Sequence, residues 1–168
     1  MKITAQEEYG LRCLLRLARS HGTASLTIPE VAAAENLSAP YVAKLLTVLR
    51  QTGLIESVRG RTGGYRLARP PAEVRLGAVM RALGEPLFQD PEYCDRHAGP
   101  ETTGPCIHHG NCSLRGLWQT LEEWMRHILD QVTLDDLIRN DVPVMRQLRA
   151  ELPSPLPPLL ALTPLSRE

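Results

Sequence analysis

Residues 27–53 read TIPEVAAAENLSAPYVAKLLTVLRQTG, and this stretch decides the fold of the first half of the chain. It opens with the capping box Thr27-Ile-Pro-Glu30, which predicts a short helix that runs to about Glu35. Asn36-Leu37 then predicts a turn, and Ser38 starts a second helix that ends at Gly53. Two short helices joined by a tight turn are the layout of a helix-turn-helix, whose second helix is a DNA-reading element.

The residues that follow this motif predict a basic β-hairpin. Two β-prone runs, 54–59 and 65–67, flank the glycine-rich tip GRTGG at 60–64. Residues 59–69 contain four arginines and no acidic residue. A hairpin directly after the second helix is the wing of a winged helix. Gly63 and Gly64 would let its backbone approach a phosphate or enter a narrow minor groove, whose potential attracts Arg61. A tight hairpin turn is the alternative reason for these two glycines.

Candidate DNA contacts lie at the start of the second helix and along the wing, because these parts of the motif meet base edges and phosphates. For Ser38 the alternative is helix capping alone, and for Lys44 and Arg66 it is a solvated surface charge. The candidates are Ser38, Pro40, Tyr41, Lys44, Arg59, Arg61, Thr62, Gly63, Gly64 and Tyr65.

The net charge of the 168 residues is zero, but the charge is unevenly distributed. Residues 1–84 carry 12 basic and 6 acidic side chains, whereas residues 85–168 carry 7 and 13. This asymmetry is typical of a basic binding surface joined to an acidic segment. The sequence has no apolar run of 18 residues and no apolar signal-peptide core, so we expect a cytoplasmic protein without a membrane helix. Structural disulfides are rare in that compartment.

The sequence predicts a mainly α-helical protein with a small β wing, organised in four parts. Residues 1–84 form a winged helix-turn-helix head, which begins with a helix over 6–20 and ends with one over 76–83. Residues 85–112 are a cysteine-bearing loop, 113–152 a long helix with short helices after it, and 153–168 a proline-rich, disordered tail. Val142–Leu152 is one of those short helices, and Thr133-Leu-Asp-Asp136 caps another.

A long helix is predicted over 113–132, about 30 Å in length. Its apolar residues recur at three-and-four spacing, and this stripe has no obvious partner within so short a chain. The stripe consists of Leu114, Leu117, Leu121, Trp124, Ile128 and Val132, widened by Trp118, Met125 and Leu129.

Three of the four cysteines, Cys94, Cys106 and Cys112, gather in the loop before this helix, whereas Cys13 lies in the first helix as an expected buried hydrophobe. Clustered thiolates favour soft metals or iron–sulfur clusters. Zinc bound by three cysteines and a histidine is an alternative, although paired C-x-x-C spacing is missing; cluster-free thiol or ligand sensing is another. Cys106 also lies near His108, but nothing supplies an orienting third group for a nucleophile, so we expect no enzyme.

Four stretches carry a family resemblance: MKIT…EYGLRCLLRLA at the start, Ser38-x-Pro-Tyr-x-x-Lys-Leu-Leu, GLIESVRGRTGGYRLARP at 53–70 and TLDDLI at 133–138. Over roughly 1–145 the chain resembles the bacterial Rrf-two family of winged-helix regulators, and its wing is similar to the NsrR type. The resemblance implies a transcriptional regulator, most often a repressor, that binds double-stranded operator DNA. It also implies a homodimer formed through the 113–132 helix and a 2Fe–2S or 4Fe–4S cluster that senses nitric oxide, redox state or iron–sulfur status.

The resemblance also implies the cluster ligands. Cys94, Cys106 and Cys112 occupy the family's cysteine loop, with a longer gap between the first two than is usual. Arg115 stands where IscR-type members have a histidine ligand, so the fourth ligand implied is Glu8 from the other subunit, as in NsrR-type members. For Glu8 the alternative is an ion pair with Arg12, one helical turn away. Loop histidines are alternative fourth ligands, namely His97, His108 and His109.

Overall fold

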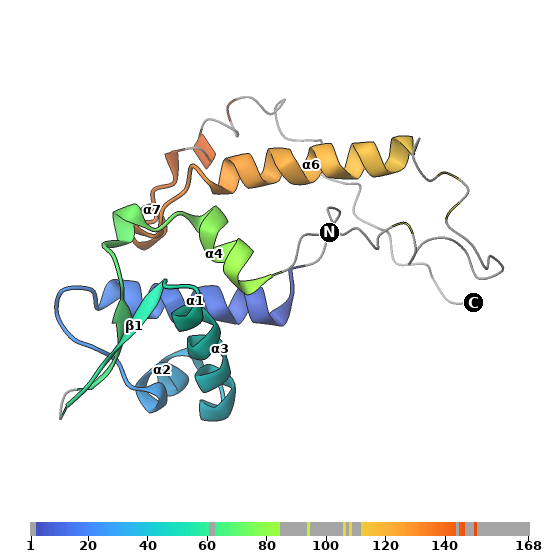
Figure 1. Ribbon diagram of the computed structural model, residues 1–168. Coiled ribbons are helices and arrows are strands. Elements are labelled where there is room, and N and C mark those ends of the chain that lie inside the picture. The colour runs from blue at the N-terminus through green and yellow to red at the C-terminus, as the bar shows by residue number, and fades with distance from the viewer. Residues whose placement is uncertain are drawn as a thin grey trace, which may run out of the picture.

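The long helix α6 (Ser113–Leu129) lies on one side of the molecule, and α2 (Ile28–Glu35), α3 (Ala39–Gln51) and the hairpin lie on the opposite side (Figure 1). Helices α1 (Ala5–Arg19) and α4 (Leu76–Leu83) lie between these two sides. This mostly helical architecture with one small sheet confirms the predicted winged helix-turn-helix fold. The structure is a computed structural model, which describes residues 3–60, 63–84, 94, 106, 108, 112–143, 145, 146 and 150.

Several predicted segments lie partly or wholly outside these described residues. They include the wing tip at Arg61 and Thr62, most of the 85–112 loop with His97 and His109, much of the helix predicted over 142–152, and the 153–168 tail. Of the loop, the described residues are Cys94, Cys106, His108 and Cys112. No helix among the described residues combines the length and the apolar character that crossing a membrane requires.

Helix α1 is the central element of the fold. Thr4 caps it: the Glu7 backbone N–H donates to Thr4 Oγ1 (3.2 Å), and the Thr4 backbone N–H donates to the Glu7 carboxylate (2.7 Å). One face of α1 is buried, and the helix contacts α2, α3, α4, β2 and α7 (Leu134–Ile138). Helix α1 therefore connects the helix-turn-helix and wing with the side of the molecule that carries α6.

The local signals of the helix-turn-helix are confirmed. Thr27 and Glu30 form the predicted capping box of α2, and Asn36 ends α2 in the left-handed conformation (φ 54°, ψ 47°). Ser38 takes the N-cap position of α3, but its side chain makes no capping hydrogen bond. The alternative that assigned Ser38 to capping is therefore wrong; Pro40 in the first turn of α3 fixes the helical φ there instead.

Strands β1 (Ile55–Val58) and β2 (Gly64–Leu67) form the predicted antiparallel wing, with Ile55 opposite Leu67. A residue from before α2 joins them: the Leu26 N–H donates to the Tyr65 carbonyl (2.9 Å), and the Tyr65 N–H donates to the Leu26 carbonyl (2.8 Å). Ile55 and Leu67 are buried in the core. The base of the wing is therefore held by the body of the head, which fixes its orientation relative to α3.

Helix α6 ends earlier than predicted, at Leu129 rather than at 132. The Asp130 carboxylate binds Arg81 of α4 (3.0 Å), and the Val132 carbonyl accepts a hydrogen bond from the Leu76 N–H (2.8 Å). Val132 is buried in the core of the head and is not part of the α6 stripe. Its spacing matched the stripe by coincidence, because an apolar residue suits both a helix stripe and a core position in the segment after the helix.

The short helix predicted from the capping box at Thr133 is confirmed as α7, and its start is bonded to the head. Thr133 and Asp136 bond reciprocally at the start of α7, and the Leu134 N–H donates to the Val74 carbonyl (3.0 Å). Val74 directly follows the short 3-10 helix η1 (Pro71–Glu73), which connects the wing to α4. The junction between α6 and α7 is thereby bound to α4 and to the segment that connects the wing to α4.

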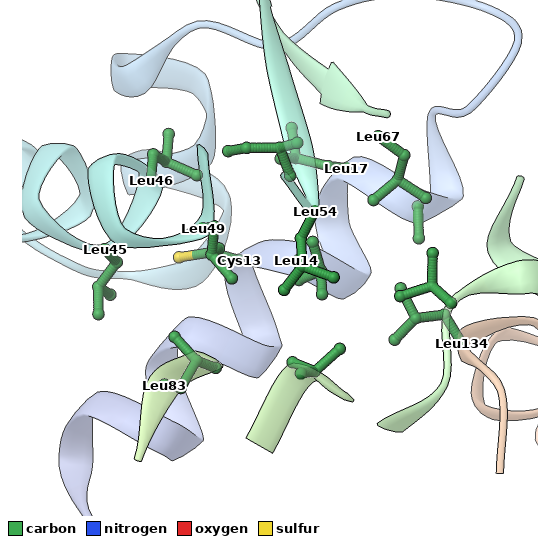
Figure 2. Packing of buried hydrophobic residues seen from close by; sticks show 14 of the residues in the cluster. Cys13, Leu14, Leu17, Leu45, Leu46, Leu49, Leu54, Leu67, Leu83 and Leu134 are labelled. Atoms are coloured by element: carbon green, nitrogen blue, oxygen red, sulfur yellow. The ribbon is translucent and has the colours of Figure 1, made fainter. Parts of the chain in front are cut away.

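Leucines and valines from α1, α3, α4 and the wing make the core, and the Cys13 sulfur lies among the leucines of α1 and α3 (Figure 2). Cys13 is fully buried, which confirms its expected role as a small hydrophobe. Burial, and secondly the nearby Glu35 carboxylate, raise the pKa of its thiol to about 11 against the opposing effect of Arg12.

This raised pKa predicts a loss of stability in alkali. The Cys13 thiol ionises near its ordinary value of 9.0 when the chain unfolds, but stays protonated to about 11 in the folded protein. Above pH 9 the unfolded state therefore binds fewer protons than the native state, and the free energy of unfolding falls as pH rises. Between pH 8 and 10.5, we expect urea unfolding under reducing conditions to report a loss about 2 kcal/mol larger for the wild type than for Cys13→Ala. Equal losses in the two proteins would contradict this assignment.

Candidate functional site

The start of α3 presents an exposed polar edge on the side of the molecule opposite α6 (Figure 1). Ser38, Pro40 and Lys44 are exposed there, whereas Val42 and the three leucines of α3 are buried. Because Ser38 makes no capping bond, its hydroxyl is oriented by no helical N–H. Exposed donors at a recognition-helix N-terminus are positioned to meet base edges in a major groove.

Contacts within the head explain the two wing glycines. A Cβ on Gly64 would lie 2.6 Å from the Leu26 carbonyl oxygen, and one on Gly63 would lie 2.7 Å from the Val58 carbonyl oxygen. Both positions therefore exclude a side chain in the free protein, because Cβ atoms do not approach backbone so closely. This favours the hairpin-turn alternative for Gly63 and adds the Leu26 bridge as the reason for Gly64.

The basic side chains of the described part of the wing differ in their partners. Arg66 Nε binds the Glu56 carboxylate across the hairpin (2.6 Å), and both side chains are about half exposed. Arg66 is therefore a surface charge, as the alternative expected, and it is paired with Glu56 in the free protein. Arg59 is exposed before the tip, and Tyr65 is partly buried against the core. Among these residues, Arg59 is best placed to meet a DNA backbone.

An open pocket of about 610 Å³ lies between the loop after α1 and the wing. Sequence reasoning missed it, because the loop and the wing are brought together by the long-range Leu26–Tyr65 bridge. Its cation Arg66 is paired with Glu56. The bonds from the Thr27 backbone and hydroxyl hold the pKa of Glu30, another lining residue, below its usual value. The charged carboxylate and the paired arginine make this pocket unsuited to a phosphate.

A second feature that the sequence did not predict links α1 to the start of α3. The rings of Tyr9 and Tyr41 pack edge to face, with centroids 6.0 Å apart and planes at 83°. The Arg12 guanidinium lies 5.4 Å from the centroid of the Tyr9 ring and binds the Glu35 carboxylate (3.1 Å). The alternative that paired Arg12 with Glu8 is therefore wrong, because the Arg12 guanidinium forms its ion pair with Glu35, more than twenty residues away.

Two of the three loop cysteines lie together at the start of α6. Cys94 and Cys112 line a pocket of about 240 Å³ with Arg115, Gly116 and Gln119. Arg115 Nη1 donates to Cys94 Sγ (3.4 Å), and the Arg115 backbone N–H donates to Cys112 Sγ (3.4 Å), so that Cys112 caps α6. The Nε atom of Arg115 is buried and has no hydrogen-bond partner among the described residues.

This donor set fits a sulfur-rich anionic group. Thiolates bind iron–sulfur clusters, and N–H groups around the sulfurs stabilise the negative charge. The unpartnered Arg115 Nε supplies such a donor. The described residues nevertheless hold no group of three histidine, cysteine or acidic side chains close enough to bind a metal. Cys106 is half-buried, and His108 and Glu8 are exposed, outside any such group.

The outer face of α6 is apolar and exposed. Trp124 is 58% exposed and Leu114 62%, while the buried residue of the helix is Glu122, at 3%, which binds Arg126 one turn later (2.6 Å). A helix that turns a carboxylate toward its own chain and tryptophan and leucine toward solvent is unfavourable for an isolated protomer. The exposed apolar residues are Leu114, Leu117, Trp118, Leu121 and Trp124.

Comparison with known proteins agrees with this arrangement. The Rrf2 (Rrf-two) family, described as an iron-dependent transcriptional regulator, matches residues 3–140. The chain is 38% identical over 141 residues to the HTH-type transcriptional regulator NsrR of Geobacillus kaustophilus, covering 83% of this chain and 91% of that protein.

Two solved structures have a similar fold. T. potens IscR superposes with a TM-score of 0.65 and 26% identity, covering 92% of this chain and 94% of that one. CymR, the global cysteine regulator of Bacillus subtilis, superposes with a TM-score of 0.65 and 29% identity, covering 83% and 98%. The relatives are described as transcriptional regulators and not as enzymes, and CymR is described as a global cysteine regulator.

Proposed function

Because this chain belongs to the Rrf2 family of transcriptional regulators, we propose that it is a homodimeric, cytoplasmic repressor whose affinity for operator DNA is set by an iron–sulfur cluster. One observation carries the sensor part of the proposal. Cys94 and Cys112, eighteen positions apart in the sequence, share a pocket with Arg115, whose Nε is buried. The signals that the cluster reports are nitric oxide, redox state or iron–sulfur status.

The start of α3 reads the major groove in this proposal. Ser38, Pro40 and Lys44 offer an exposed hydroxyl, an apolar ring and a cation there, with Tyr41 behind them. The wing adds phosphate and minor-groove contacts through Arg59 and through residues 61–65, namely Arg61, Thr62, Gly63, Gly64 and Tyr65. Phosphate contacts by these cations make the affinity strongly dependent on salt.

The dimer forms through α6 in this proposal. Its exposed stripe, from Leu114 to Trp124, covers the same stripe of a second copy, as a two-fold axis requires. Each large apolar side chain buried in this way stabilises the dimer by about 1.5–3 kcal/mol. Two recognition helices held by one dimer then meet two half-sites of the operator.

The cluster, 2Fe–2S or 4Fe–4S, is held by Cys94, Cys106 and Cys112, with Glu8 of the partner subunit as the fourth ligand. When bound, it supplies iron that reacts with nitric oxide or oxidants, and a carboxylate leaves iron more readily than a thiolate does. Arg115 holds Cys94 toward the pocket through its Sγ contact. These ligands clamp the cysteine loop of one subunit to α1 of the other. Releasing the clamp changes the spacing of the two recognition helices.

A second candidate is a regulator that senses thiols without a cluster. It is favoured by the likeness to CymR, a global cysteine regulator, and by the direct contact between Arg115 Nη1 and Cys94 Sγ. A cation beside a thiol promotes its reactivity. Structural zinc, bound by the three cysteines and a loop histidine, is the other possibility for the same residues.

Anaerobic purification tests this proposal. We expect a brown protein with equal amounts of iron and acid-labile sulfide, at two or four of each per monomer, that retards a duplex selected from a random-sequence pool. Exposure to nitric oxide should bleach the visible spectrum and change the affinity for that duplex. A colourless protein that contains zinc, or that resists cluster reconstitution yet still binds the duplex, would replace the cluster with zinc or thiol sensing.

A further inference from the structure

The DNA-reading end of α3 rests on a polar and aromatic network that begins on α1. Tyr41, in the first turn of α3, packs its ring edge to face with Tyr9 of α1 (6.0 Å). Tyr9 in turn lies under the Arg12 guanidinium (5.4 Å). Tyr41 directly follows Pro40, which is exposed at the reading end of the helix. A shift of the Tyr9 ring is therefore passed to the residues that meet DNA.

Arg12 is fixed at two points, so it holds the Tyr9 ring in one orientation. Its Nε donates to Glu35 Oε2 (3.1 Å) and its Nη2 to the Glu35 backbone carbonyl (2.7 Å). Glu35 is the last residue of α2, and its side chain is nearly buried. Arg16 binds the other oxygen of the same carboxylate (2.9 Å) but has no contact with Tyr9 among those described. Helices α1, α2 and α3 therefore meet through Arg12 and Tyr9.

The first turn of α1 also touches the place where the cysteine loop begins. The Gln6 side-chain amide donates to the Leu83 carbonyl (2.6 Å) at the end of α4, immediately before residues 85–112. Glu8 lies between Gln6 and Tyr9 on the same turn. A pull on this turn, from the loop or from a ligand to Glu8, therefore acts directly on Tyr9.

From these contacts we propose that Tyr9 and Arg12 are positioning residues that couple the first turn of α1 to the DNA-reading end of α3. They set the ratio of specific to non-specific DNA affinity, and they transmit the state of the cysteine loop to it. This inference rests on the proposed function, because it needs a DNA-binding protein whose loop has two states. It goes beyond that function by naming the residues that connect input and output.

Four variants of the full-length protein test the proposal. Tyr9→Leu removes the aromatic ring, and Tyr9→Phe keeps it. Arg12→Gln removes the guanidinium that lies over the Tyr9 ring, and Arg16→Gln is the matched control. Arg16→Gln breaks an ion pair to the same Glu35 carboxylate but leaves the Tyr9 ring untouched. For each variant we would measure the Kd for a duplex selected by the wild type and for a scrambled duplex, with and without the cluster. Thermal unfolding midpoints establish that each variant is folded.

We expect Tyr9→Leu and Arg12→Gln to lower the specific to non-specific ratio roughly tenfold, and to shrink the difference between cluster-loaded and cluster-free protein by a similar factor. Tyr9→Phe and Arg16→Gln should stay within about twofold of the wild type. The proposal is overturned if Arg16→Gln lowers the specific to non-specific ratio as much as Arg12→Gln does, or if Tyr9→Phe lowers it as much as Tyr9→Leu does. It is also overturned if the affinities for the selected and the scrambled duplex fall by the same factor. A wild type that selects no sequence would instead overturn the proposed function, and the inference with it.

Discussion

Replacing Trp124 by glutamate should convert the dimer into a monomer at micromolar concentration. Trp124 is 58% exposed in the protomer and is the last large apolar residue of the exposed α6 stripe. In a two-fold dimer the substitution removes two tryptophans from the interface and buries two carboxylates that have no partner. The loss of tryptophan burial alone destabilises the dimer by at least about 4 kcal/mol over the two subunits, which raises the dissociation constant of the dimer about a thousandfold or more. Sedimentation velocity measures this directly.

His127→Glu is the matched control for this experiment. His127 is exposed one turn after Trp124 but is not one of the apolar residues of the stripe, so its substitution adds the same carboxylate without removing apolar burial from the interface. We expect His127→Glu to remain dimeric and to keep its affinity for operator DNA. Trp124→Glu should be monomeric and should bind operator DNA more weakly. If Trp124→Glu stays dimeric, or if the wild type is a monomer, the dimer does not form through α6.

The sequence was sufficient for the elements whose signals are local. The capping boxes at Thr27 and Thr133, the left-handed turn at Asn36 and the glycine-tipped wing each depend on residues within a few positions of one another. Such signals act the same way in any context, so they predicted helix-turn-helix and wing correctly. The exposed stripe of α6 was also readable, because periodicity reports which residues share a helix face.

The sequence failed where contacts between distant residues decide the outcome. Glu35 and not Glu8 takes Arg12, because the packing of α1 on α2 brings Glu35 within 3.1 Å. Gly64 is required because a side chain there would collide with the Leu26 carbonyl, and no pattern of neighbouring residues predicts this contact. The end of α6 is fixed by Arg81 and by the core position of Val132. In each case the local sequence was compatible with more than one arrangement, and contacts between distant segments determined which one forms.

The candidate sensor site is an intermediate case. The sequence identified Cys94 and Cys112 but treated Arg115 only as a residue that cannot coordinate metal. The structure places Arg115 at the centre of their pocket, with one N–H on each sulfur and a buried Nε left over. The Arg115 side chain meets Cys94 through Nη1, whereas its backbone N–H, in the first turn of α6, meets the capping sulfur of Cys112.

Serine at any one of the three loop cysteines should abolish cluster binding. A serine hydroxyl stays protonated at neutral pH and is a poor ligand for iron, so Cys94→Ser, Cys106→Ser and Cys112→Ser should each retain less than about a tenth of the wild-type iron. Cys13→Ala is the internal control, because Cys13 is fully buried among the leucines of α1 and α3 and should leave the iron content unchanged. Iron and acid-labile sulfide assays after anaerobic purification give the answer.

Glu8→Gln distinguishes the fourth ligand from the cysteines. Glu8 is exposed on α1 and is not needed by Arg12, which binds Glu35, so its substitution should leave stability within about 0.5 kcal/mol of the wild type. An amide cannot supply the charge that a carboxylate brings to iron. We therefore expect the variant to keep its iron but to show an altered visible circular dichroism spectrum and a changed rate of reaction with nitric oxide. If spectrum and rate are both unchanged, Glu8 is not a ligand, and a loop histidine becomes the residue to replace next. If serine at Cys106 also leaves the iron in place, the three-cysteine site itself is wrong.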